Sequence, residues 1–307
     1  MAAGPLSPGQ LNALVSALAP GGRALRIRPL RGGMSTSVHR VRLANSVDSV
    51  NDVVIVRFDA DWHRADPDIA RCEFKLLQAL AQTDVPVAEP LLVDDGSIFG
   101  WPTLVTTRLP GRTWLNPPPS HLEGYIRSMA NLLVRVHSLG IADLDFVPRQ
   151  IPPLDRTLAE ASELPDPIER AVWRELHATR PESCARRVLV HNDYWPGNLL
   201  WRRGRLVGLV DWEAPRLGDA GRDVGTCHGD ASMLFGHAAA ERFLENYIEA
   251  GGEPGENLRF WKLYHVAHAL GELDSWLPGL HALGRTDFTL ERLRSVVQEM
   301  GRVALDS

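Results

Sequence analysis

The feature that most constrains the fold of this chain is a short polar motif set between two apolar runs. The motif follows the apolar residues 187–190 and has the spacing H-x-D-x-x-x-x-N, formed by His191, Asp193 and Asn198. A second apolar run then ends in Asp211. Buried strands on both sides of a polar loop hold its side chains rigidly. The pattern therefore predicts two carboxylates and one amide, all within 19 residues, at one rigid site.

This layout is that of a kinase catalytic loop followed by a metal-binding aspartate. Phosphoryl transfer needs positioning and charge neutralisation more than covalent chemistry. Asp193 is the candidate to orient the acceptor hydroxyl and take its proton. Asn198 and Asp211 are the candidates to hold Mg²⁺ against the phosphates of ATP, because magnesium prefers hard oxygen ligands. A turn capped by Asp and Asn is the alternative, which the flanking β-like runs disfavour.

Composition excludes several other classes of protein. A formal net charge of -5 and a pI near 6.1 disfavour a general nucleic-acid binder. No apolar run approaches the ~20 residues that span a bilayer, and residues 1–10 lack a secretory signal pattern. We therefore expect a cytoplasmic protein with no membrane segment. The three widely spaced cysteines show no CxxC pattern and are expected to be reduced thiols.

The first third of the chain predicts a small β-rich lobe with one principal helix. Ser7, followed by Pro8 and by Gln10 three residues after the cap, predicts a short helix to about Leu18. The principal helix is expected over 68–81, where apolar residues recur at helical spacing. The expected strands are 25–30, 38–43, 53–58, 85–93 and 103–109.

Prolines at 110 and 117–119 mark a lobe boundary, so we expect lobes at 1–109 and 110–307. In the second lobe Ser120 is predicted to cap a long helix. Further helices are expected at about 166–179, 237–250, 257–278 and 288–304. The only β-like runs expected there flank the polar motif, at 187–190, 199–201 and 206–211. The predicted class is α+β, with a β-rich lobe and a larger, mainly helical lobe.

The motif, together with Asp211-Trp212-Glu213, Gly218-Asp219 and Asp223, resembles the aminoglycoside phosphotransferase / choline kinase family. These are small-molecule kinases whose two-lobe fold is related to that of protein kinases. The resemblance implies Asp193 as catalytic base and Asn198 and Asp211 as magnesium ligands. It also implies that Asp219 and Asp223 tie the segment after the metal site to the catalytic loop. Capping of a helix start before Val224 is equally consistent with these two aspartates.

The sequence signals for nucleotide binding are less specific than the catalytic-loop motif. A glycine-containing loop between the first two strands is predicted to cover the ATP phosphates with its backbone amides; its candidate residues are Gly32, Gly33, Ser35, Thr36 and Ser37. The loop lacks a full GxGxxG, so a plain hairpin turn stays open. The segment 104–109 is expected to be the hinge that binds the adenine edge.

Kinases place a lysine on the third strand to hold the phosphates, and Arg57 stands there in a chain that has only two lysines. Glu73, on the following helix, is the expected partner that orients Arg57. A solvated surface pair is the alternative.

Two groups of residues on one C-terminal helix have open interpretations. His265, His268 and Glu272 share a helix face, which favours a polar face or pocket wall over a metal site. Aromatic residues at helical spacing are more often core than acceptor pocket; here they are Trp261, Tyr264 and Trp276. The resemblance places the acceptor pocket among these helices, where Glu272 and Asp274 could attract a cationic substrate.

The first hypothesis is therefore an enzyme that moves the ATP γ-phosphate to a hydroxyl of a small molecule. The second is a kinase-like nucleotide-binding protein without productive transfer, for which Arg57 and the incomplete glycine loop are the only support. A protein kinase is a third interpretation, disfavoured because no A-P-E segment follows Asp211. An amino sugar, a macrolide, a simple sugar, homoserine and an amino alcohol all remain compatible as acceptors.

Overall fold

The computed structural model describes residues 5–30, 36–45, 50–60, 63, 66, 68–150 and 154–306. The chain divides into two compact units, Met1–Gly111 with Val207–Glu213, and Arg112–Leu206 with Ala214–Ser307. The sequence placed all of 110–307 in one lobe, whereas the segment that carries Asp211 packs with the first unit.

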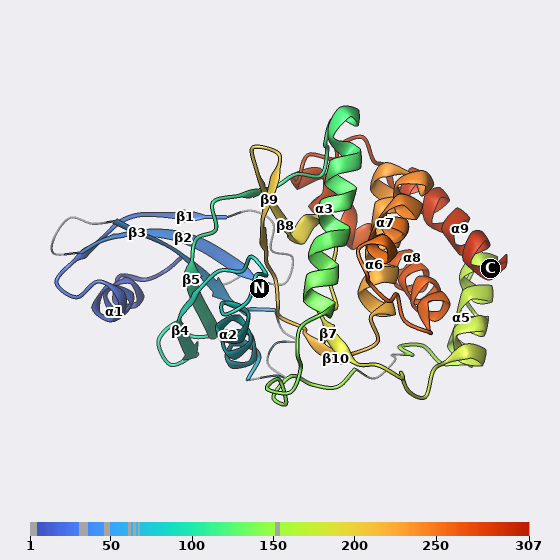
Figure 1. The fold of residues 1–307 in the computed structure, drawn as a ribbon. Helices are drawn as coiled ribbons and strands as arrows, with labels where there is room; N and C mark the ends of the chain where they lie inside the picture. The colour runs from blue at the N-terminus through green and yellow to red at the C-terminus, as the bar shows by residue number, and fades with distance from the viewer. Residues whose placement is uncertain are drawn as a thin grey trace. The chain divides into compact units, whose positions relative to one another are not determined.

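The first unit is built on a five-stranded antiparallel sheet with the order β1-β2-β3-β5-β4 (Figure 1). Its strands are β1 (Arg23–Pro29), β2 (Ser37–Ala44), β3 (Val50–Arg57), β4 (Pro90–Asp95) and β5 (Pro102–Thr107). Alternate residues of the inner strands, such as Val41 and Ile55, are fully buried, as the period of two requires. The strand expected at 85–93 begins only at Pro90, because pairing with β5 starts there.

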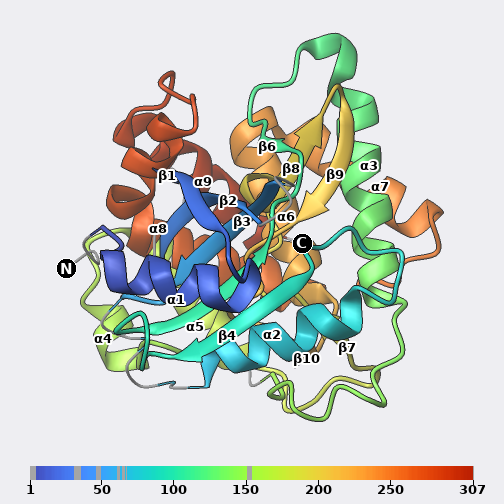
Figure 2. The same cartoon turned by 90° about the vertical axis from the view of Figure 1, so that its left-hand side faces the viewer.

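Two helices pack on this sheet. Helix α1 (Pro8–Leu18) begins with the predicted capping box, in which Ser7 and Gln10 exchange hydrogen bonds. Helix α2 (Ile69–Leu80) lies against β4 and β5 (Figure 2) and buries Leu76 and Leu80. The predicted β-rich lobe with one principal helix is thus confirmed for the first unit.

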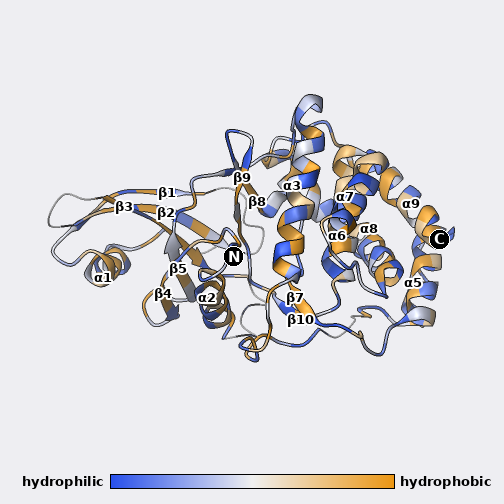
Figure 3. Cartoon of the chain, viewed as in Figure 1, coloured by the Kyte–Doolittle hydropathy of each residue, from blue (hydrophilic) through white to orange (hydrophobic). Residues whose placement is uncertain are grey.

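The second unit is mainly helical. Its helices are α3 (Pro119–His137), α4 (Leu158–Ser162), α5 (Pro167–Thr179), α6 (Gly221–Phe235), α7 (His237–Glu249), α8 (Leu258–Ala282) and α9 (Leu290–Asp306). Figure 3 shows hydrophobic and hydrophilic residues mixed along these helices, as expected where one face packs inward. No helix in the described part of the chain is long and apolar enough to cross a membrane.

Short strands accompany the helices, and they correct the sequence prediction. They are β6 (Arg112–Thr113), β7 (Val188–Val190), β8 (Leu199–Arg202), β9 (Arg205–Leu209) and β10 (Arg216–Gly218), in the orders β10-β7 and β6-β8-β9. Strands β6 and β10 were not expected, because two or three residues give no periodic signal. Ser120 does not cap α3: that helix starts at Pro119, whose fixed φ and missing N–H suit a first turn.

Helix α6 is buried on nearly all sides; from the sequence only its start before Val224 was considered, and its extent was not predicted. Gly221, Gly225 and Gly229 recur on it at intervals of four and face α8. A Cβ on Gly225 would lie 2.9 Å from the backbone carbon of Trp261, and one on Gly229 would lie 2.1 Å from Cδ2 of His265. The missing side chains therefore allow α6 and α8 to approach closely.

Candidate active site

The catalytic-loop motif lies between β7 and β8. Its backbone is hydrogen-bonded to the side chain of Asp223 on α6. One carboxylate oxygen of Asp223 accepts a hydrogen bond from the His191 backbone N–H at 2.7 Å, and the other accepts from the Asn192 N–H at 2.8 Å. Asn192 adopts a left-handed φ of 73°, which asparagine tolerates better than most residues. The tie between Asp223 and the catalytic loop, implied by the family resemblance, is thus confirmed.

Arg222, the neighbour of Asp223, also holds this loop at Asn192. Its Nε donates to Oδ1 of Asn192 at 2.9 Å, and its Nη2 donates to the Asn192 carbonyl at 3.0 Å. Asp219 behaves differently, because its carboxylate accepts from the Gly221 N–H at 2.7 Å and from the Asn257 side chain at 2.7 Å. Asp219 therefore satisfies the N–H of the first residue of α6, although the N-cap position itself is Ala220; this is close to the alternative interpretation.

Asp193 and Asn198 are brought together at the exposed end of this loop. The Asn198 side chain is buried, and its Nδ2 donates to Oδ2 of Asp193 at 2.9 Å and to the Asp193 carbonyl at 3.0 Å. The Asp193 side chain is exposed. Gly197 leaves room for the Trp195 ring, which would lie 1.9 Å from a Cβ there. The loop thus presents a solvent-facing carboxylate that is oriented by a buried amide.

Asp211 belongs to the first unit and follows β9 by two residues. The strand ends at Leu209, so the β-like run ends earlier than the sequence predicted. Asp211 has a φ of 72°, an uncommon conformation for a residue with a side chain. Such backbone strain recurs at functional sites. Within the same unit, the Leu209 N–H donates to the Pro86 carbonyl at 2.8 Å and anchors this segment.

Arg57 and Glu73 are also in the first unit, and both are buried, with exposed fractions of 3% and 7%. The solvated surface pair is therefore wrong. Burial is the main cause that raises the pKa of Glu73 to about 8, and the neighbouring Glu213 carboxylate adds to it. A backbone hydrogen bond from Trp212 partly offsets this rise in the pKa. Burial lowers the pKa of Arg57, and the Asp59 carboxylate opposes that shift. The ion pair between Arg57 and Glu73 stays a prediction.

Part of the predicted phosphate loop can be placed. Gly32, Gly33 and Ser35 lie outside the described residues, and Thr36 directly precedes β2. Ser37 opens β2 opposite Arg57, and its hydroxyl donates to the Asp59 carboxylate.

In the expected hinge, the backbone N–H groups of two residues already donate hydrogen bonds to carbonyl groups of neighbouring segments. The Thr107 N–H donates to the Glu89 carbonyl at 2.8 Å, and the Arg108 N–H donates to the Asp52 carbonyl at 3.0 Å. Of the segment 104–109, Leu109 therefore becomes the candidate donor to an adenine ring.

The helices of the second unit form a polar and aromatic wall near Asp193. The Tyr264 hydroxyl donates to Asp155 at 2.9 Å, and its ring is stacked on His268 with centroids 6.2 Å apart. Trp276 meets His268 edge-on at 5.6 Å. Trp261 and Tyr264 both belong to the buried core of this unit, and Trp276 packs against it, so the core interpretation of these aromatic residues holds. No group of three metal-ligating side chains occurs among the described residues, so nothing there supports the metal interpretation of this helix face.

Sequence reasoning missed Asp230 in this wall. Burial, and then the Asp193 charge, raise the pKa of Asp230 well above its usual range, while Arg222 opposes the shift. Asp193 also acts on the pKa of His268, which burial lowers. Asp230 and His268 are therefore electrostatic neighbours of the candidate base. The available signal was the spacing: Asp230 follows Asp223 by seven residues, two helical turns along the same face.

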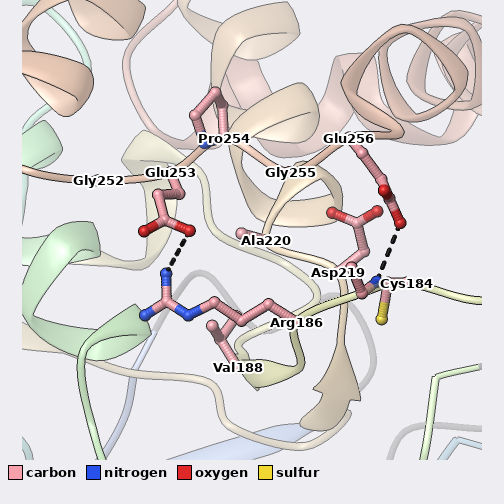
Figure 4. A pocket seen from close by; sticks show the side chains of 11 residues that line it. Cys184, Arg186, Val188, Asp219, Ala220, Gly252, Glu253, Pro254, Gly255 and Glu256 are labelled. Atoms are coloured by element: carbon pink, nitrogen blue, oxygen red, sulfur yellow. Dashed lines mark hydrogen bonds and ion pairs between the residues drawn. The ribbon is translucent and has the colours of Figure 1, made fainter.

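A separate cavity of about 390 Å³ lies beside Asp219 in the second unit (Figure 4). Arg186 pairs with Glu253 at 3.1 Å across its rim, and the Ala185 N–H donates to Glu256 at 2.9 Å. Its lining includes neither Asp193 nor Asn198. The cavity is therefore distinct from the catalytic loop.

Comparison with known proteins then decides the family. Residues 26–264 match the model described as "Phosphotransferase enzyme family". The chain belongs to this family. An aminoglycoside 3'-phosphotransferase of Streptomyces fradiae is 33% identical over 211 residues, which cover 61% of this chain and 75% of that protein. The family makes the chain an enzyme, a small-molecule kinase with a hydroxyl group as acceptor.

Solved structures of the phosphotransferase family show the same fold. The macrolide 2'-phosphotransferase of Brachybacterium faecium has a TM-score of 0.63 at 22% identity, with 94% of this chain and 98% of that chain covered. A streptomycin–ATP ternary complex of an aminoglycoside phosphotransferase has a TM-score of 0.62 at 16% identity, with 88% and 90% covered. The predicted α+β kinase-like class is therefore confirmed.

Proposed function

We propose that this phosphotransferase moves the γ-phosphate of ATP to a hydroxyl of a small molecule, with Asp193 as the base. The observation that carries the proposal is the exposed Asp193 carboxylate held at 2.9 Å by the buried Asn198 amide. In the transfer, the acceptor oxygen forms a bond to the γ-phosphorus while its proton passes to Asp193. The bond from the γ-phosphorus to the β,γ-bridging oxygen breaks, and ADP leaves.

The chain offers oxygen ligands that suit magnesium. Because the Asn198 amide nitrogen is directed at Asp193, its amide oxygen is the atom that would face a metal ion. Asp211 would supply the second ligand, and both are the hard oxygens that Mg²⁺ prefers. When bound, the ion would neutralise charge on the ATP phosphates. A solved family member in complex with ATP supports ATP as the donor.

The first unit would contribute the remaining contacts to the nucleotide. Arg57 carries a positive charge on β3 and would hold phosphate oxygens, with Glu73 as its orienting neighbour. The segment that leads into β2, with Thr36 before the strand and Ser37 as its first residue, would cover the phosphates. Leu109 would bond the adenine edge.

For the acceptor we propose a hydroxyl-bearing small molecule of the aminoglycoside or macrolide kind. The support is that the relatives of this chain include proteins named for both classes of compound. Transfer of a proton from the acceptor to Asp193 requires only that a hydroxyl group of the acceptor reach the carboxylate. The acceptor therefore has to be identified by assay.

The test is Mg²⁺-dependent ADP release from purified protein across aminoglycosides, macrolides, sugars and amino alcohols. Asp193→Ala should lower acceptor-stimulated release by about 10²- to 10⁴-fold and leave Mg-ATP binding intact. Asp145→Ala, at another exposed aspartate of the second unit, is the matched control and should behave as wild type. Stimulated rates in Asp193→Ala equal to those of the control would disprove the assignment.

A second variant separates the metal role from the base. Asp211→Ala should weaken Mg²⁺-dependent ATP binding, because one of two protein ligands is lost. Titration of fluorescent ATP with and without Mg²⁺ measures this directly. An unchanged magnesium dependence would count against Asp211 as a ligand.

A further inference from the structure

A chain of three buried side chains in the second unit ends at the catalytic loop. Asp223 on α6 accepts hydrogen bonds from the N–H groups of His191 and Asn192. Its Oδ2 also lies 3.2 Å from Nε2 of His137 on α3, and Nδ1 of His137 lies 2.7 Å from the hydroxyl of Tyr247 on α7. The exposed fractions of Asp223, His137 and Tyr247 are 0%, 3% and 0%. Three helices thus contribute to one buried hydrogen-bonded chain.

The chemistry of Asp223 fixes the direction of each hydrogen bond in this chain. An ionised carboxylate only accepts hydrogen bonds, so Nε2 of His137 has to carry the ring proton. In the neutral imidazole Nδ1 is then an acceptor, and the Tyr247 hydroxyl is its donor. Burial, and then the Asp223 charge, raise the pKa of Tyr247, so its hydroxyl keeps its proton at neutral pH. Each side chain therefore orients the next, from Tyr247 through His137 to Asp223.

Packing holds the Tyr247 end of the chain in place. The rings of His137 and Tyr247 meet edge-on, with their centroids 5.8 Å apart. A Cβ on Gly252 would lie 2.5 Å from the Tyr247 ring, and the Gly252 N–H donates to the Tyr247 carbonyl at 2.9 Å. The Glu253 carbonyl lies 3.3 Å from the Tyr247 hydroxyl, farther than Nδ1 of His137. The ring thus has little room to move, and its short hydrogen bond is the one to His137.

His137 also completes the set of partners around a buried carboxylate. In the part of the chain that the structure describes, His137 is the only basic side chain that forms an ion-pair contact with Asp223. Oδ2 of Asp223 meets both His137 and the His191 N–H, whereas Oδ1 meets the Asn192 N–H. The third hydrogen bond restricts rotation of the carboxylate about its Cβ–Cγ bond. The two backbone N–H groups are therefore held in one arrangement, directly before Asp193.

We infer that His137 and Tyr247 are positioning residues for phosphoryl transfer, which act through Asp223 to hold the catalytic loop so that the Asp193 carboxylate reaches the acceptor hydroxyl. This inference rests on the proposed function, because it takes Asp193 as the base. A displacement of a reacting group by about 1 Å can lower a rate by about 100-fold. Loss of the chain should therefore lower the rate of transfer and leave nucleotide binding intact.

The first measurement separates turnover from nucleotide binding, with the acceptor of the test panel that stimulates the wild type most. Tyr247→Phe removes one hydroxyl and keeps the ring, whereas His137→Leu removes both hydrogen bonds of the imidazole. Each should lower the kcat of ADP release by about 10-fold or more and leave the KM for ATP unchanged. His137→Gln should recover most of the rate, because an amide group can donate to Asp223 and accept from Tyr247. A wild-type kcat in Tyr247→Phe and His137→Leu would overturn the inference.

Two control variants change buried polar groups outside the chain. His228→Gln alters a histidine that is bonded to Glu241 at 2.8 Å. Tyr125→Phe removes the hydroxyl of a buried tyrosine whose ring is stacked on Trp201. Both should keep the kcat of the wild type. Losses in these controls as large as those in the chain variants would mean that general destabilisation lowers the rate, and would overturn the inference.

A double variant tests whether Tyr247 acts through His137. In the His137→Leu background, Tyr247→Phe should cause no further loss of kcat, because the hydroxyl no longer has an imidazole to orient. Fully additive losses would contradict a chain that runs from Tyr247 to Asp223.

A second measurement needs no acceptor. Amide hydrogen exchange, followed by mass spectrometry of peptides that cover 189–194, reports on the His191 and Asn192 N–H groups. Exchange there should be about 5-fold faster or more in Tyr247→Phe and His137→Leu than in the wild type and the controls. Unchanged exchange would overturn the inference.

Asp193→Ala separates this inference from the proposed function. Stimulated ADP release that persists in Asp193→Ala refutes the proposed function, while the exchange measurement still tests the chain. Release that is lost in Asp193→Ala but kept at the wild-type rate in both chain variants refutes the inference alone.

Discussion

Replacing Asp223 with alanine should reveal how strongly α6 holds the catalytic loop. The carboxylate is fully buried and accepts three hydrogen bonds, at 2.7 Å from the His191 N–H, 2.8 Å from the Asn192 N–H and 3.2 Å from Nε2 of His137. A hydrogen bond to a charged group contributes about 1.5–3 kcal/mol, and each buried donor left unpaired keeps its desolvation cost. The free energy of unfolding should therefore fall by about 5 kcal/mol, a large share of the ~5–15 kcal/mol typical of a domain.

The assay is urea unfolding of the chain, monitored by tryptophan fluorescence. Asp223→Asn should cost about half as much as Asp223→Ala, because one carbonyl oxygen still accepts while the new amide group faces an N–H. Glu245→Ala is the control: it removes an ion pair with Arg242 of 2.7 Å, but this pair is solvent-exposed. If Asp223→Ala shifts the urea midpoint no more than Glu245→Ala does, the reasoning is refuted.

Three further predictions concern other buried contacts. Gly229→Ala should destabilise the protein by about 1–3 kcal/mol and lower its melting temperature, because the new Cβ would overlap His265; a higher melting temperature would exclude the close packing. Burial, and then the Glu213 carboxylate, raise the pKa of Glu73 from 4.5 to about 8, so the folded state keeps a proton that the unfolded chain loses, and stability should fall as pH rises through that window. Glu73→Gln should therefore gain stability relative to wild type as pH rises from 5 to 8.5 in urea unfolding, whereas a stability difference that does not change with pH would contradict a raised pKa of Glu73. Arg57→Lys should retain much of the turnover if charge alone matters, and complete loss would show that the site needs the guanidinium fork.

Secondary structure was predicted best from the sequence where the signal lies within a few neighbouring residues. The capping box at Ser7, the presence of five strands in the first unit and the amphipathic α2 were predicted correctly, because their periodicity and caps are local, whereas the expected start of β4 was five residues too early. The catalytic-loop motif was readable for the same reason: its spacing lies within a few residues. These signals sufficed for the fold class and for the family.

The sequence failed where long-range packing decides. Helix α6 carries glycine, aspartate and histidine on a fully buried surface, so it shows neither apolar periodicity nor helix-favouring residues. The contact of α8 with Gly229 overrides those propensities, and it cannot be seen from either helix alone. The same holds for Glu73, whose neighbour Glu213 lies 140 positions away along the chain.

Helix α6 links the two sides of the proposed chemistry in the second unit. Its first turn holds the catalytic loop through Arg222 and Asp223, and two turns later Asp230 faces His265 in the wall. A rigid helix fixes the distance between these points at 1.5 Å per residue, so the catalytic loop and the contact between α6 and α8 keep a constant relation. A change that shifts α6 against α8, such as a larger residue at 229, should therefore displace the catalytic loop and lower turnover more than it alters ATP binding. Measuring acceptor-stimulated ADP release and the KM for ATP in Gly229→Ala decides this, and a stimulated release equal to that of the wild type would contradict the role assigned to α6.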